Sequence, residues 1–119
     1  MNVEPLHLMN AQDQASQYQR HIEEAMASAD SGEMKQHIQE AMPFGQNVLD
    51  SLEEALNMTE DPDRADRIEE SMHHMSASMD QGDQALEASE DEMEDFVAEM
   101  RKQAQQSMTF LAEAMGAVP

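Results

Sequence analysis

Apolar residues recur along this chain at alternating steps of four and three positions, in four runs of similar length. Such steps place an apolar stripe along one side of an amphipathic helix. Helix-breaking residues separate the runs at positions 30–32, 59–62 and 88–89. Four stripes joined by short loops predict an all-α fold, an antiparallel up-down-up-down four-helix bundle with helices near residues 4–30, 33–58, 62–87 and 90–115. With 119 residues in total, we expect a single acidic helical-bundle domain, residues 1–119.

Individual residues predict where the helices begin and where they bend. Asp61 precedes Pro62, a pairing typical of an N-cap and a first helical residue. Ser89, followed by Glu92, matches a capping box. Pro43 lies within the second run, where its missing amide proton predicts a kink. The predicted stripe of the first helix consists of Leu8, Ala11, Ala15, Tyr18, Ile22, Ala25 and Ala29, and that of the second of Met34, Ile38, Ala41, Gly45, Val48, Leu52 and Ala55. The stripe of the third helix consists of Ala65, Ile68, Met72, Met75, Met79, Gly82 and Leu86, and that of the fourth of Met93, Val97, Met100, Ala104, Ser107, Leu111 and Ala114.

The charge and the cysteine count exclude several classes of function. Twenty-six acidic residues against six basic ones give a formal charge of −20. Nucleic acids and anionic membranes are bound through Lys and Arg, so we expect no direct nucleic-acid binding and no membrane association. No apolar run approaches the roughly 18 residues of a membrane-spanning helix. The absence of cysteine excludes disulfides, Cys-based zinc sites and thiol nucleophiles.

The sequence lacks the motifs of familiar enzyme classes. It contains no Gly-rich phosphate loop, no GxSxG and no HExxH. Adjacent carboxylates such as Glu23 and Glu24 face different directions on a helix and cannot share one proton. We therefore expect a non-enzymatic protein without catalytic residues.

Histidine and methionine supply candidate metal ligands, because imidazole is the commonest metal ligand and a thioether suits copper. Folding the first two helices about the turn at 30–32 brings residues whose numbers sum to about 63 to one level. His21 then lies opposite Met42, and Met26 lies opposite His37. Two levels about one helical turn apart would each hold one histidine and one methionine.

The same register pairs the carboxylates Glu23 and Glu40, which would complete coordination of harder ions. On the third helix, methionines at i, i+3 and i+7 lie near two adjacent histidines. The predicted ligand set is His21, His37, His73, His74, Met26, Met42, Met72, Met75 and Met79. The ion would be copper or a divalent transition metal. An alternative assigns the 13 methionines to core filling, because Met is a good helix former that fits irregular gaps.

Two segments repeat with histidine at their start, residues 21–26 (HIEEAM) and 37–42 (HIQEAM). A looser copy begins at Arg67, and Gly32 follows His21 by eleven positions. This pattern resembles the small metal-binding proteins, which are His-rich four-helix bundles of Gram-negative bacteria. The resemblance implies reversible binding of divalent or copper-like ions in the periplasm, with His21, His37 and His74 at positions of the repeat.

A second hypothesis starts from the densest acidic segment, residues 87–99, which contains seven acids and no base. Helix-dipole stabilisation and general solubility account for some of these charges. The acidic rod also resembles DNA mimics and some anti-CRISPR proteins, which occupy the nucleic-acid groove of a basic partner. This interpretation would make the protein an inhibitor that binds its partner through Glu87, Glu90, Asp91, Glu92, Glu94, Asp95 and Glu99.

The two hypotheses imply different partners and different compartments. The first requires metal ions and the second a basic protein surface, and a homodimer is compatible with either. The residues at the start of the chain lack a basic segment followed by an apolar one. The protein would be periplasmic if a leader was removed and cytoplasmic otherwise, and the sequence does not decide between these locations.

Overall fold

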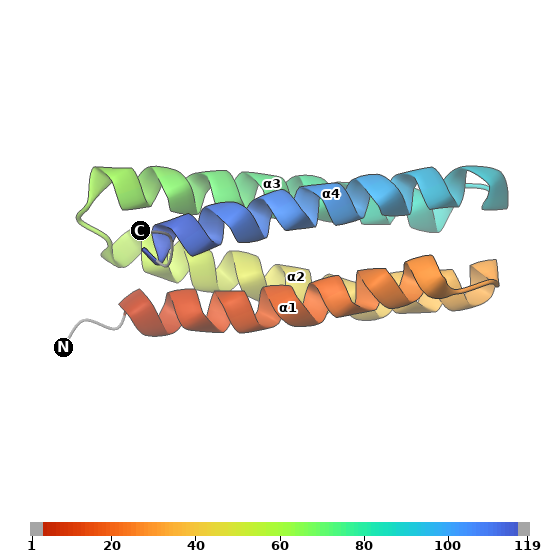
Figure 1. Ribbon diagram of the computed structural model, residues 1–119, viewed down its shortest axis with the longest axis horizontal. Helices are drawn as coiled ribbons and strands as arrows, with labels where there is room; N and C mark the ends of the chain where they lie inside the picture. Colours follow the sequence, from red (N-terminus) through yellow and green to blue (C-terminus); the bar gives the residue numbers. More distant parts are fainter. Residues whose placement is uncertain (1–3, 117–119) are drawn as a thin grey trace.

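The computed structural model describes residues 4–116 and contains four long helices. These are α1 (Glu4–Ala27), α2 (Ser31–Met58), α3 (Pro62–Glu87) and α4 (Glu90–Ala114). They lie side by side in an elongated bundle of 48 × 23 × 20 Å, in which each helix runs antiparallel to the next (Figure 1). The hairpins α1–α2 and α3–α4 lie against each other with both turns at the same end (Figure 1). The predicted all-α four-helix bundle is confirmed.

The loops are short, and an aspartate N-cap begins two of the helices. The Asp30 carboxylate accepts a hydrogen bond of 2.8 Å from the Gly32 amide, so α2 begins at residue 31 and not at 33. Helix α1 correspondingly ends at residue 27 and not at 30. The Asp61 carboxylate accepts a 3.0 Å bond from the Asp63 amide, which confirms Asp61 as the N-cap of α3.

Ser89 is the N-cap of α4, but its side chain makes no capping hydrogen bond. The predicted capping box with Glu92 is therefore wrong. The Ser89 carbonyl instead accepts backbone bonds from Glu92 and Met93. Three acidic residues in the first turn, at positions 90–92, interact favourably with the positive end of the helix dipole. This interaction stabilises the start of α4 in place of the missing side-chain bond.

Helix α2 continues through Pro43, whose ring is exposed and so avoids competing for core space. Helix α3 likewise continues through the polar segment 80–83. There Gly82 is buried, and a side chain at this position would meet the end of Met100 and the sulfur of Met42. Close packing between helices thus compensates for the low helix propensity of glycine.

The core follows the predicted stripes of α2 and α4 throughout, and that of α1 except for Ala29, which lies beyond the helix and is exposed. The stripe of α3 differs from the prediction. Its buried residues are Ile68, Ser71, Met75, Ser78, Gly82 and Ala85. Four predicted core residues are only half-buried: Ala65, and also Met72, Met79 and Leu86, which pack beside this stripe.

Serines can occupy core positions of α3 because each one is hydrogen-bonded. Ser71 and Ser107 each donate a 2.8 Å bond to the backbone carbonyl of the other, which joins α3 to α4. Ser78 donates a 2.6 Å bond to the Met100 carbonyl. Satisfied hydroxyls avoid the penalty for burying polar groups, and small side chains let the two helices approach closely.

No helix within residues 4–116 is both long and apolar enough to cross a membrane.

Candidate metal centre

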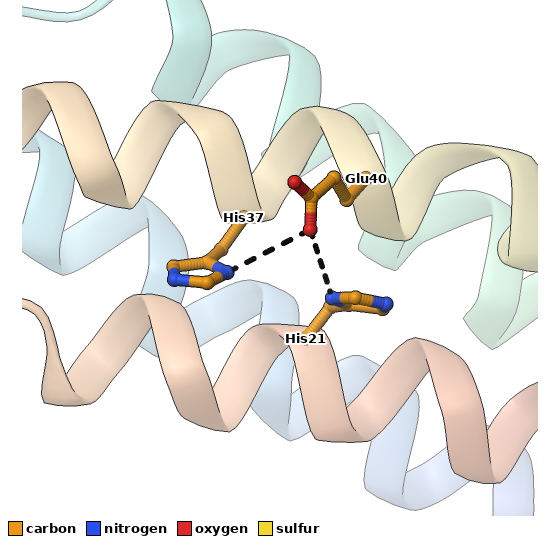
Figure 2. Close-up of side chains that lie close together, drawn as sticks. All are labelled: His21, His37 and Glu40. Carbon is orange, nitrogen blue, oxygen red and sulfur yellow. Dashed lines mark ion pairs between the residues drawn. The ribbon is translucent and has the colours of Figure 1, made fainter.

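His21 and His37 face each other across the α1–α2 hairpin, near its turn (Figure 2). His21 lies at the edge of the buried α1 stripe, next to Ile22. Its side chain is 12% exposed, and that of His37 is 26% exposed. The ring of His21 stacks on Phe44 of α2, with centroids 5.4 Å apart and planes 19° apart. This stacking holds the His21 ring in the interface between the two helices.

One carboxylate oxygen lies between the two imidazoles (Figure 2). Glu40 Oε2 is 3.5 Å from His21 Nδ1 and 3.9 Å from His37 Nδ1. Both Nδ1 atoms are buried and neither has a hydrogen-bond partner. These separations exceed the usual 2.7–3.2 Å of an N–H···O bond, so Glu40 satisfies neither nitrogen in this arrangement.

The spacing of these three atoms suits a shared cation. They lie within 4.8 Å of one another, and within residues 4–116 no other His, Asp or Glu residues form such a group. Tetrahedral ligands bound at about 2.0–2.1 Å are separated by about 3.3–3.4 Å. Small side-chain movements would therefore bring His21, His37 and Glu40 to one ion. Two histidines and one carboxylate are a recurrent ligand set for divalent transition metals.

Glu24, one turn before the end of α1, supplies a second carboxylate beside the group. Its Oε2 atom is 3.3 Å from His37 Nδ1. The sequence register had paired Glu23 with Glu40, but Glu23 turns toward α4 and forms a 2.6 Å ion pair with Arg101. Adjacent residues point in different directions on a helix, so a shift of one position exchanges the two roles.

The five methionines of the predicted ligand set lie in different environments of the bundle. Met75 is fully buried, and Met72 and Met79 are half-buried against the core. The sulfur of Met42 lies against Gly82, and Met26 is 40% exposed at a groove beside α4. Core packing accounts for most of these positions, as the alternative interpretation expected, and ligation by the thioethers stays a prediction.

His73 and His74 lie on α3 and do not belong to the group of His21, His37 and Glu40. His73 is exposed, whereas the His74 ring stacks on Phe110 of α4 with centroids 5.4 Å apart and planes 4° apart. His74 Nδ1 is 2.8 Å from Gln103 Oε1. That nitrogen already has a partner, so His74 differs from the two histidines that face Glu40.

Comparison with protein-family models, with curated proteins and with solved structures finds no match to this chain.

Proposed function

We propose that this protein binds a divalent transition-metal ion between α1 and α2, through His21, His37 and Glu40. The observation that supports the proposal is that two buried Nδ1 atoms without partners face the same carboxylate oxygen. A buried polar atom left unpaired costs about 1–3 kcal/mol. One cation between the three atoms would remove this cost for both histidines.

The donor set favours particular ions. Two imidazoles and a carboxylate suit Zn²⁺, Cu²⁺ or Ni²⁺, whereas Cu⁺ prefers thiolates and thioethers. Glu24 is placed to act as a fourth ligand, because its carboxylate already lies beside His37. The rest of the surface contributes through its charge, since a net charge of −20 raises the local concentration of cations. The proposed role is reversible binding and not catalysis.

Isothermal titration of the purified protein with Zn²⁺, Cu²⁺ and Ni²⁺ tests the proposal. We expect one tight site per chain, lost in a His21→Ala/His37→Ala double variant. The matched control is His73→Ala, which removes an exposed histidine of α3 and should leave the site intact. Circular dichroism would verify that each variant remains helical. Tight binding that survives in the double variant would refute the proposal.

A second candidate function is binding of a basic protein partner by the acidic segment 87–99. The observation that favours it is that all seven acids of this segment are exposed. Within residues 4–116, only Glu99 among them lies within 4.0 Å of a base, Lys102. The interaction would weaken with salt and on neutralising Asp91, Glu92, Glu94 and Asp95. A complex insensitive to both changes would exclude this function.

A further inference from the structure

A groove of about 370 Å³ opens between the α1–α2 turn and the first half of α4. Its apolar lining comes from two methionines, one on α1 and one on α2, together with two small residues of α4. Two carboxylates of α4 form its rim. The lining residues are Met26, Met34, Val97, Ala98, Glu94 and Asp95. A cavity of this volume lies within the usual range for ligand sites, about 300–1,000 Å³.

Two polar contacts between the hairpins flank the groove. The Ser31 hydroxyl donates a 2.9 Å bond to Glu90 Oε1 near the turn, and Arg101 forms a 2.6 Å ion pair with Glu23 farther along α4. The α4 lining residues, positions 94–98, fall between these contacts. Glu90 and Arg101 are eleven residues apart on α4, which corresponds to about 16 Å at 1.5 Å per residue. The groove therefore lies between two polar contacts that are about three helical turns apart along α4.

The surface of the groove combines adaptable apolar groups with negative charge. Met26 is 40% exposed, although its side chain is large and apolar. Met34 is only 6% exposed and lies at the bottom of the groove. Flexible thioether side chains repack around different apolar groups and occur at adaptable binding surfaces. Glu94 and Asp95 are exposed at the rim. An occupant would thus place an apolar group on the methionines and a positive charge beside the carboxylates.

We propose that this groove binds a cationic amphipathic helix of a partner protein. Its apolar side would rest on Met26 and Met34, and its Lys or Arg side chains would pair with Glu94 and Asp95. A second copy of this chain is disfavoured as occupant, because both copies would carry a charge of −20. Anionic ligands are disfavoured by the same rim. The proposal is independent of the metal site, and it rests on the second candidate function, because Glu94 and Asp95 belong to the acidic segment 87–99. It differs from mimicry of nucleic acid in requiring an apolar contribution from Met26 and Met34.

The test is a fluorescence anisotropy titration with a synthetic Leu/Lys peptide of about 14 residues, long enough to fill the groove as a helix. A peptide of the same composition, with its leucines distributed around the helix, is the control ligand. All titrations contain a metal chelator, so that the result is independent of the metal site. We expect the amphipathic peptide to bind about tenfold more tightly than its scrambled control.

Two pairs of variants separate the apolar contribution from the electrostatic one. Met26→Ser should weaken binding about fivefold to tenfold, whereas Met58→Ser, which changes a methionine of equal exposure at the far end of α2, should have no effect. Glu94→Gln/Asp95→Asn should weaken binding and reduce its salt dependence more than the exposed α3 control, Asp66→Asn/Glu69→Gln.

Three results would overturn the proposal. The first is equal affinity for the two peptides, and the second is equal affinity of the two methionine variants. Either would show that charge alone attracts the peptide. The third is self-association of the free protein in sedimentation experiments that Met26→Ser abolishes, which would assign the groove to a second copy.

Discussion

The Tyr18 hydroxyl lies 2.8 Å from Ser78 Oγ and joins α1 to α3 inside the core. The Ser78 proton is directed to the Met100 carbonyl at 2.6 Å, so the tyrosine must be the donor to Ser78. Both side chains are completely buried. A chain of two hydrogen bonds therefore connects α1, α3 and α4 at one level of the bundle.

Loss of the Tyr18 hydroxyl and loss of the Ser78 hydroxyl should each destabilise the fold, but by different amounts. Tyr18→Phe deletes a donor but leaves Ser78 bonded to Met100, so we expect a loss of about 1 kcal/mol. Ser78→Ala leaves a buried phenol without a partner, which should cost about 1–3 kcal/mol. Urea denaturation would measure both values. The double variant should lose less than the sum of the single losses, and strict additivity would show that the two hydroxyls do not interact.

Alkaline pH should unfold the protein through the same tyrosine. Burial raises the pKa of the Tyr18 phenol well above its ordinary value of 10.0, and nearby Asp83 raises it further. Above about pH 10 the unfolded chain loses a proton that the folded chain retains, so the free energy of unfolding falls as the pH rises. It stops falling only where the folded phenol also ionises.

The tyrosinate absorbance reports this event directly, because Tyr18 is the only tyrosine of the sequence. We expect the absorbance to rise together with the loss of helical circular dichroism. Tyr18→Phe should flatten the alkaline decline in stability. Ionisation that follows an ordinary phenol curve, with the helices still intact, would contradict the burial of this side chain.

The periodicity of the sequence predicted three of the four buried stripes because their residues are apolar. It failed on α3, where Ser71 and Ser78 occupy core positions and Met72 and Met79 lie at the side. At positions 71–72 and 78–79 a serine stands beside a methionine, and a pattern of apolar residues selects the methionine. The backbone carbonyls of α4 that accept these hydroxyl protons are set by the packing of two helices, and no local pattern encodes them.

The register of the first hairpin predicted part of the candidate metal site. Numbering the two helices about the turn placed His21 opposite Met42 and His37 opposite Met26, on two levels about one helical turn apart, and paired Glu40 with Glu23. It assigned the second carboxylate to Glu23, although Glu24 is the residue beside His37. The difference comes from helix rotation, since neighbouring positions differ by about 100° around the axis. Packing of the buried α1 stripe in the four-helix core sets this rotation, and it leaves Glu23 facing Arg101 of α4. Numbering of two helices alone does not include that packing.

The two carboxylates beside the histidines should contribute unequally to metal affinity. Glu40→Gln replaces the carboxylate that faces both imidazoles with a neutral amide, and we expect a loss of more than about tenfold. Glu24→Gln neutralises a carboxylate that lies beside only one of the two histidines, His37, so its effect should be smaller. Glu33→Gln, an exposed acid of the first turn of α2, is the matched charge control. Calorimetric titration with Zn²⁺ distinguishes the three, and equal losses would indicate general attraction by charge.

The two buried glycines should respond differently to an added methyl group. At Gly45 the new carbon would lie 2.9 Å from the Met79 sulfur and 2.9 Å from Tyr18 Cε1. The tyrosine ring cannot move away without breaking its bond to Ser78, so Gly45→Ala should overpack the core and cost about 1–3 kcal/mol. At Gly82 the closest atom, at 2.9 Å, is the terminal methyl of Met100, which can rotate aside.

Gly82→Ala should therefore be nearly neutral, because the gain in helix propensity, about 1 kcal/mol, offsets the displacement of a flexible side chain. Urea denaturation of both variants gives the comparison. The double variant Gly45→Ala/Tyr18→Phe provides a further check, since freeing the ring should recover part of the loss at Gly45. If Gly45→Ala were as stable as Gly82→Ala, the Tyr18 ring would not be fixed by its hydroxyl, and the central polar contact of the bundle would have to be weak.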